Sequence, residues 1–262
     1  MTFANSASRG TRTVTKALVL ACLLVAVARV DAQESRVDLP FSDGEVLSYR
    51  AVSTRFGSFG TGTLRVDGPE DVRGESTHRL SFEFRGRVAV FTVQDYTQSW
   101  VNQEATASFR YSKRESSPLG SRLEEVEIYP AERRWQAASG SGGKTNTSEP
   151  LDELSFLYYL RTLPLQSGDV YTLFRHFNPS RNPVVVRVLR RERVRVPAGE
   201  FETIVVEMRV RDERVSAKDG AMRLYLTDDV ARVPVLIESS APWVGTTRLI
   251  LVSQTGGRAS TR

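Results

Sequence analysis

The side chains that most often carry catalysis are scarce in this chain. It has two histidines, His78 and His176, and one cysteine, Cys22, among 262 residues. A metal site or an acid–base pair needs several such groups at a spacing that brings them together. The adjacent carboxylates Asp228 and Asp229 would point to opposite faces of a strand, and we favour a turn capped by aspartate. We therefore expect no metal, no cofactor and no enzyme activity. A cleft that placed His176 beside Asp228 or Asp229 would instead indicate a hydrolase or lyase.

Residues 138–145 (ASGSGGKT) superficially match nucleotide and acyl-transfer motifs. A phosphate-binding loop needs a helix that begins at its Lys-Thr pair, whereas residues 146–150 (NTSEP) are typical of a loop. Residues 141–144 also spell the S-x-x-K of penicillin-recognising enzymes, but the S-D-N and K-T-G partner motifs are absent from the sequence. We interpret the stretch as a flexible linker by its composition.

One helix is predicted over Glu149–Pro164. Its apolar residues recur at helical spacing over a wide face, Ser148 or Asp152 can cap its start, and the proline ends it. A helix this apolar must be covered on most sides, so we expect it to plug or flank a sheet.

Two groups of residues are candidates for binding. Tyr158, Tyr159 and Arg161 on the helix are predicted to lie at the mouth of a cavity, with Arg161 meeting a polar head group. The second group is a possible partner-binding face, formed by residues that alternate along one strand: Arg191, Arg193 and Arg195. The competing interpretation of this face is a solvated surface neutralised by nearby glutamates, and we favour it.

Most of the rest of the chain alternates with a period of two residues. The alternating stretches are rich in β-branched and aromatic residues and are separated by Gly, Pro, Ser and Asp clusters. We predict an all-β fold: an antiparallel half-open β-barrel of about a dozen strands with one embedded α-helix.

The clearest predicted hairpin runs over residues 184–210. Valines on its first strand and apolar residues on its second share one face only if the loop has an odd number of residues, because a slip of one residue flips every side chain. We predict a three-residue loop, Ala198-Gly199-Glu200, which pairs Val194 with Ile204.

The first 32 residues predict export. A basic segment precedes an apolar run of about a dozen residues, and small residues follow it. This is the pattern of a secretory signal peptide. The apolar run is too short to span a membrane comfortably. We expect residues 33–262 to form a single exported, periplasmic domain with no transmembrane span; secretion or peripheral attachment stays open. The residues that end at Cys22 faintly resemble a lipoprotein signal. Without lipid attachment there, Cys22 is removed with the signal peptide.

Charge excludes one class of partner. The formal net charge is +5, and the signal peptide holds four of the basic residues and one of the acidic residues, which leaves +2 for the rest. A nearly balanced domain lacks the strong basic footprint of a nucleic-acid binder.

Several segments, in this order and spacing, resemble the exported bacterial family of unknown function DUF3108. They are residues 41–49 (FSDGEVLSY), 150–165 (PLDELSFLYYLRTLPL), 191–201 (RERVRVPAGEF) and 226–235 (LTDDVARVPV). The resemblance implies an exported β-rich protein without an established activity. The layout is also similar to the open β-barrels of periplasmic lipoprotein carriers.

Two functions follow as expectations. The first is a non-catalytic periplasmic binding or carrier protein for an apolar ligand such as an acyl chain, which requires a cavity between helix and sheet. The alternative is a structural or assembly factor of the cell envelope that acts through protein or glycan contacts, which predicts a filled core.

Overall fold

The computed structural model describes residues 38–88, 90–117, 120–211, 221–241 and 245–258. The predicted signal peptide and Cys22 therefore lie outside the described residues. The described residues belong to one compact unit.

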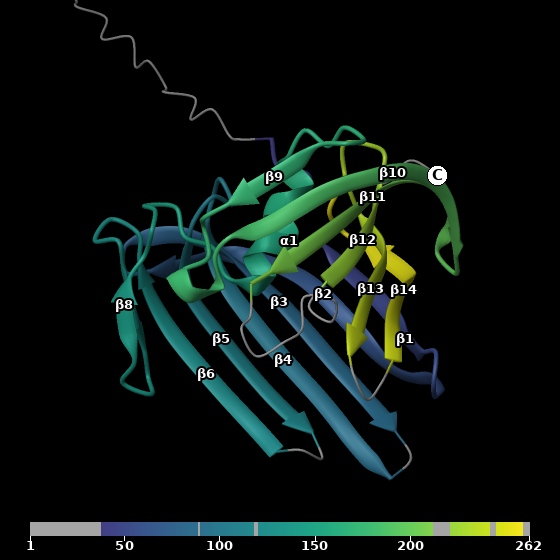
Figure 1. The fold of residues 1–262 in the computed structure, drawn as a ribbon, viewed down its shortest axis with the longest axis horizontal. Coiled ribbons are helices and arrows are strands. Elements are labelled where there is room, and N and C mark those ends of the chain that lie inside the picture. The colour runs from purple at the N-terminus through teal and green to yellow at the C-terminus, as the bar shows by residue number, and fades with distance from the viewer. Residues whose placement is uncertain (1–37, 89, 118–119, 212–220, 242–244, 259–262) are drawn as a thin grey trace, which may run out of the picture. The chain divides into compact units, whose positions relative to one another are not determined.

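The described residues form a single antiparallel sheet of fourteen strands and one α-helix, α1 (Figure 1). The sheet is not closed: β8 and β9 are its two edges, and the strand order is β8-β7-β6-β5-β4-β3-β2-β1-β14-β13-β12-β11-β10-β9. The predicted all-β class, half-open sheet and single helix are confirmed. The strands are β1 (Val46–Ser53), β2 (Gly57–Val72), β3 (Glu75–Val88), β4 (Phe91–Asn102), β5 (Ser108–Ser117), β6 (Gly120–Tyr129), β7 (Arg134–Ala137), β8 (Gly142–Lys144), β9 (Val170–Leu173), β10 (Val184–Val196), β11 (Gly199–Val210), β12 (Ala221–Thr227), β13 (Pro234–Ala241) and β14 (Gly245–Thr255).

The sheet consists of two meanders, β1–β8 and β9–β14, in which each strand pairs with its neighbours in sequence. The two meanders join where β1 pairs with β14, with Val46 opposite Thr255. The helix lies in the connection between the meanders, and Figure 1 shows it between β2–β4 and β10–β12.

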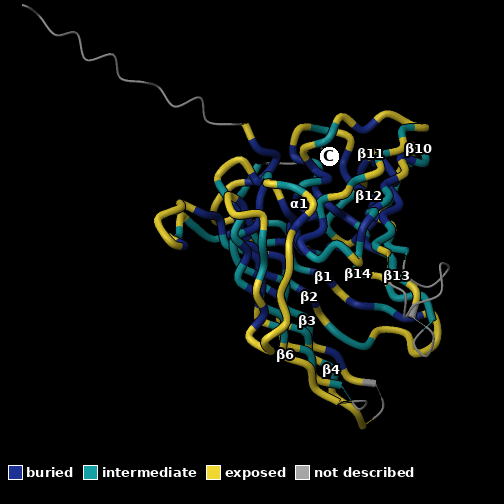
Figure 2. Tube along the Cα trace, turned by 60° about the vertical axis from the view of Figure 1, so that its left-hand side comes forward, coloured by how far each residue is buried: buried dark blue, intermediate teal, exposed yellow. Residues whose placement is uncertain are grey.

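The core surrounds α1 (Glu153–Thr162). Seven of its ten residues are buried, and its apolar side chains pack with residues from both meanders, for example Leu64, Leu80, Ile204 and Val206. In Figure 2 the buried residues lie around the helix and the central strands, whereas exposed residues mark the ends of the hairpins. Within the described part of the chain, no helix has the length and apolar character that a membrane span requires.

The helix begins later than the sequence predicts because Asp152 caps it. The Asp152 carboxylate accepts hydrogen bonds from the backbone N–H groups of Leu154 and Ser155, both at 2.9 Å, and the Ser155 hydroxyl accepts one from the Asp152 N–H at 2.8 Å. This is a capping box, which satisfies N–H groups that the first turn leaves unpaired. The Ser99 hydroxyl of β4 donates to the same carboxylate at 2.5 Å and fixes the helix start on the sheet.

Replacement of this cap should destabilise the fold. Asp152→Ala removes two backbone partners and leaves the buried Ser99 hydroxyl without its acceptor. We expect the free energy of unfolding to fall by about 2 kcal/mol, measured by chemical denaturation. Asp152→Asn retains an oxygen acceptor and should lose less. Equal stability of Asp152→Ala and the wild type would contradict the capping role.

The predicted register of the β10–β11 hairpin is wrong. Val196 pairs with Gly199, so the turn has two residues, and Val194 lies opposite Phe201 rather than Ile204. Gly199 has a positive φ of 149°, a backbone conformation that glycine accepts without a Cβ penalty.

A β-bulge restores the predicted shared face in the first half of β10, where a two-residue turn would otherwise break it. The register shifts between Val188 and Arg190, and beyond it Val188 pairs with Val206 and Val186 with Met208. One extra residue in a strand has the same effect on facing as one extra residue in the loop. The predicted face therefore holds for Val186 and Val188, whereas Val194, opposite Phe201, lies on the other face of the sheet.

Candidate functional site

Arg161 stands in the last turn of α1, and its side chain is completely buried in an ion pair with Glu45. Its Nη1 donates to Glu45 Oε1 at 2.6 Å and its Nη2 donates to Glu45 Oε2 at 2.9 Å. Nη2 also donates to the carbonyl oxygens of Pro40, at 3.1 Å, and Ala231, at 2.9 Å. This two-pronged geometry is the one in which a guanidinium binds a carboxylate most strongly. The pair ties the start of β1, the end of α1 and the β12–β13 connection together.

The C-terminal segment closes over the same carboxylate. Gly257 has a φ of 67°, and a Cβ at this position would lie 2.9 Å from the Glu45 side chain. Glycine is therefore required here both for its backbone conformation and for the close approach.

Aromatic rings cover the other sides of the ion pair. The Arg161 guanidinium lies 5.2 Å from the Phe41 ring centre and 5.4 Å from that of Tyr158, and the two rings meet edge to face at 5.0 Å. The Tyr158 hydroxyl is buried without a hydrogen-bond partner among the described residues. Burial raises the pKa of Tyr158 well above its ordinary value. The phenol is therefore neutral at physiological pH, and Glu45 is the carboxylate that balances Arg161.

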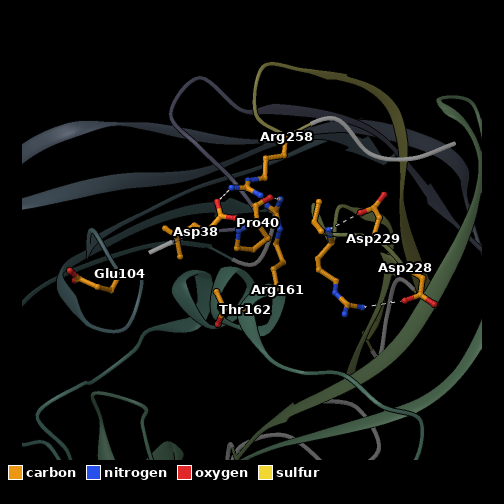
Figure 3. A pocket seen from close by; sticks show the side chains of 11 residues that line it. Asp38, Pro40, Glu104, Arg161, Thr162, Asp228, Asp229 and Arg258 are labelled. Atoms are coloured by element: carbon orange, nitrogen blue, oxygen red, sulfur yellow. Dashed lines mark hydrogen bonds and ion pairs between the residues drawn. The ribbon is translucent and has the colours of Figure 1, made fainter. Parts of the chain in front are cut away.

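A pocket of about 490 Å³ opens beside this cluster at the C-terminal end of α1 (Figure 3). Three guanidinium groups and four carboxylates are among its lining residues, so both signs of charge are present. Figure 3 shows Asp38 and Glu104 on one side of Arg161, and Asp228 and Asp229 on the other. The lining residues are Asp38, Leu39, Pro40, Glu104, Arg161, Thr162, Asp228, Asp229, Val230, Arg232 and Arg258.

Contacts within the chain already organise several of these charges. Arg258 pairs with Asp38, and Arg232 lies 3.6 Å from Asp228. The Asp229 carboxylate accepts the N–H groups of Ala231 at 3.0 Å and Arg232 at 3.1 Å and so fixes the loop. Between them, Val230 is 72% exposed. The lining therefore combines an exposed apolar side chain with charged groups that contacts within the chain already hold.

The structure brings together two of the three predicted ligand-binding residues. Tyr158 and Arg161 are three positions apart on one face of α1 and share the cluster around Glu45. Tyr159 lies on another face, half-buried, with the Arg175 guanidinium 4.4 Å from its ring centre.

The predicted partner face on β10 carries a paired cation at each position. Arg191 pairs with Asp228 at 2.6 Å, Arg193 with Glu202 at 2.6 Å and Arg195 with Glu200 at 2.7 Å. The pairing makes this surface nearly neutral, as the solvated-surface interpretation requires. A partner-binding role for it stays a prediction.

His176 lies far from Asp228 and Asp229, the aspartates with which it could have formed a hydrolase site. His176 Nε2 lies 3.5 Å from Glu153 Oε1, at the N-terminal end of α1, whereas Asp228 and Asp229 line the pocket at the C-terminal end. The ten-residue helix separates them by about 15 Å.

Sequence reasoning missed Glu45, the residue that Arg161 binds. It lies in the quoted segment 41–49, but nothing local marks it as buried, and its partner is 116 positions away. The signal that could have found it is the rule that a buried guanidinium needs a carboxylate.

A second pocket of about 400 Å³ lies beside β6 and β7, where the Trp135 and Phe177 rings meet at 5.5 Å. Its wall also contains Arg122 and Glu124, which pair with each other at 2.6 Å. It contains none of the predicted site residues.

Comparisons with known proteins agree with this fold. The family described as protein of unknown function (DUF3108) matches residues 47–252. A crystal structure of a β-barrel-like protein of domain of unknown function DUF1849 from Brucella abortus is similar, with a TM-score of 0.53 and 11% identity over 80% of this chain and 96% of that one. An identity this low shows a shared fold alone.

Two further crystal structures match more loosely. One is of a protein from Bacteroides fragilis assigned as exported and having a YmcC-like fold, with a TM-score of 0.36 and 13% identity over 83% of this chain and 98% of that one. The other is of a protein from Parabacteroides distasonis assigned as a lipoprotein, with a TM-score of 0.31 and 9% identity over 85% of this chain and all of that one. A search of curated proteins found no match.

Proposed function

The chain belongs to the DUF3108 family of unknown function, and from this premise we propose that it is an exported, non-catalytic assembly or structural factor of the cell envelope. It contacts a partner protein through the pocket at the C-terminal end of α1. The first expectation from the sequence, a carrier for an apolar ligand, needs an open cavity between the helix and the sheet.

The filled interior is the observation that carries the proposal. Phe156, Tyr158 and Leu160 of α1 are fully buried and pack against equally buried residues of the sheet, among them Leu80 and Ile204. In the described residues the helix thus occupies the concave side where an acyl chain would lie. This packing favours the assembly factor over the carrier.

The pocket at the helix end suits a polypeptide better than an acyl chain. Its lining offers guanidinium donors and carboxylate acceptors close to each other, and Val230 is an exposed apolar residue among them. Protein interfaces commonly combine an apolar contact at the centre with a polar rim. A hydrocarbon tail would displace water from these charged groups and offer them no hydrogen bond, at a cost in free energy.

The test compares two valines of similar exposure. Val230 is 72% exposed at the pocket, and Val170 is 59% exposed on the edge strand β9. A Val230→Asp variant should lose a protein that co-purifies with the exported chain from its own envelope, and Val170→Asp should retain it. Retention in both variants, or loss in both, would contradict recognition at the pocket.

Native mass spectrometry of the same preparation separates this function from the carrier. A protein that acts by surface contact should show its bare mass once the partner is removed. A reproducible lipid-mass adduct that disappears on changing Tyr158 would overturn the proposal and restore the carrier.

A further inference from the structure

The two edges of the sheet differ in how well they resist pairing with a further strand. At one edge, β8 consists of two glycines and an exposed lysine, residue types that weaken or block strand pairing. At the other edge, residues 170–174 of β9 and its C-terminal extension read VYTLF, with no charged residue, glycine or proline. Figure 1 shows β9 as the outermost strand beside β10. β9 is therefore the edge that can still accept a strand.

The backbone just beyond β9 shows which of its groups point away from β10. The His176 N–H donates to the Asn182 side chain at 2.9 Å, and the His176 C=O accepts from the same amide at 3.0 Å, on the side where β10 begins. The neighbouring Arg175 C=O accepts the Leu151 N–H at 2.6 Å, on the opposite side. Backbone groups alternate in this way from one residue to the next along an extended strand.

By this alternation, Tyr171 and Leu173 direct their N–H and C=O groups away from β10, as Arg175 does. Within the described part of the chain, no backbone hydrogen bond is made on that side of β9. A row of unpaired groups along an edge is a template for another strand. The template ends at Phe174, because Leu151 occupies the same side from Arg175 onward.

The side chains of this segment divide between the two faces of the strand. Val170 is 59% and Phe174 is 56% exposed, and the exposed Thr172 lies between them on the same face. Tyr171 and Leu173 lie on the other face and pack against the core. The exposed apolar groups thus stand directly beside the free backbone groups, where a paired strand would cover both.

We propose that β9 pairs with β9 of a second copy of this chain, antiparallel, across a two-fold axis at Thr172. Tyr171 and Leu173 of the second copy exchange backbone hydrogen bonds with each other. Val170 lies opposite Phe174 of the second copy, and Thr172 lies opposite its own counterpart. The two fourteen-stranded sheets then continue into each other through an isologous interface.

The segment is complementary to itself, which favours a second copy over an unrelated strand. In the antiparallel register each exposed valine meets an exposed phenylalanine, a pairing of β-branched and aromatic side chains that stabilises sheets. These pairs are the ones without hydrogen bonds between them, whose side chains approach most closely. The charged residues that flank the segment, Asp169 and Arg175, have opposite signs, so the same register avoids like charges across the axis.

This interface is independent of the function proposed above, because residues 170–174 do not line the pocket at α1. The two proposals therefore fail separately. Val170→Asp, the variant expected to keep the co-purifying protein, should lose the dimer. Val230→Asp should lose the co-purifying protein and keep the dimer.

The experiment is light scattering during size-exclusion chromatography of the exported protein, purified from its own envelope and freed of the co-purifying protein. We expect twice the mass of one chain at high concentration and the mass of one chain after dilution. The dimer should dissociate on dilution because an interface of so few residues belongs to the small, transient class.

Variants of Thr172 test the two-fold axis itself. Thr172→Lys or Thr172→Glu brings two like charges together across the axis, so each should raise the dissociation constant of the dimer by roughly tenfold or more. A mixture of the two variants should form the dimer again, because lysine then faces glutamate. Thr92→Glu is the control: Thr92 is an exposed threonine of β4, opposite Arg87, and this variant should dimerise as the wild type does.

Three results would overturn the proposal. One is a wild type that stays monomeric at high concentration, and another is a dimer that Thr172→Lys leaves unchanged. The third is a pair of monomeric Thr172 variants, folded by circular dichroism, that do not recombine when mixed. If the wild type is monomeric and Thr172→Lys loses an envelope protein, the edge belongs to a strand of that protein instead.

Discussion

Arg161→Met is expected to lower the free energy of unfolding by about 3–5 kcal/mol, roughly 10 °C in Tm for a domain of this size. The change leaves the Glu45 carboxylate buried without its cation, and it removes the donors to the carbonyl oxygens of Pro40 and Ala231. An uncompensated buried charge costs more than the ion pair gained. Chemical denaturation of both proteins measures the difference.

A surface arginine provides the matched control. Arg195 also forms a guanidinium–carboxylate pair, with Glu200 at 2.7 Å, but its side chain is largely exposed. Arg195→Met should change stability little, because solvent screens exposed pairs. The double variant Arg161→Met with Glu45→Leu should recover part of the loss, since no buried charge is left alone. An equal effect of Arg161→Met and Arg195→Met would show that burial of the pair is not what matters.

The second large effect is a loss of stability in acid caused by His176. Burial lowers the pKa of this histidine to about 4, while Asp152 and Glu124 act in the opposite direction. Its Nδ1 accepts the Asn178 N–H at 3.1 Å, and its ring lies against Phe156 and Phe177. The native state thus holds the imidazole neutral, and the unfolded state takes up a proton near pH 6.5.

A depressed pKa of a base fixes the direction of the change. The unfolded chain binds more protons than the native chain between about pH 6.5 and 4, so stability falls as the pH falls through this window. The full contribution is present above pH 6.5, and its loss amounts to about 3 kcal/mol for a shift from 6.5 to about 4.

Denaturation at several pH values, compared between the wild type and His176→Gln, isolates this contribution. The comparison is needed because burial raises the pKa of Asp152, which makes its own contribution fall as the pH rises. The variant should lack the loss between pH 6.5 and 4, and His78→Gln, which leaves His176 in place, should keep it. An unchanged acid profile in His176→Gln would refute the assignment.

Local pattern sufficed for the fold class because each strand and the helix carry their own periodicity. The alternation along β1, for example, places Leu47, Tyr49 and Ala51 inside, and apolar spacing identified the helix. The residues at which the elements begin and end were harder to predict. The helix begins at Glu153 rather than Glu149, because Asp152, not Ser148, accepts the first free N–H groups.

The site depended on contacts that local pattern does not encode. Arg161 could be placed on the helix, but its partner Glu45 and the Ala231 carbonyl come from distant segments that only the folded sheet brings together. The prediction of the β10–β11 register failed for a related reason. Alternation along the sequence does not show where a bulge interrupts it, so Val188 and Val194 were predicted on one face although they lie on opposite faces.

The β1–β14 seam also has a consequence for how the chain folds. Every other strand pairing in the sheet joins neighbours in sequence, which needs only short loops to close and favours rapid formation. The seam must bring together residues about two hundred positions apart. We therefore expect each meander to nucleate separately and the seam to close in the rate-limiting step, with Arg161 reaching the first meander at Glu45 and the second at Ala231 only when both are in place.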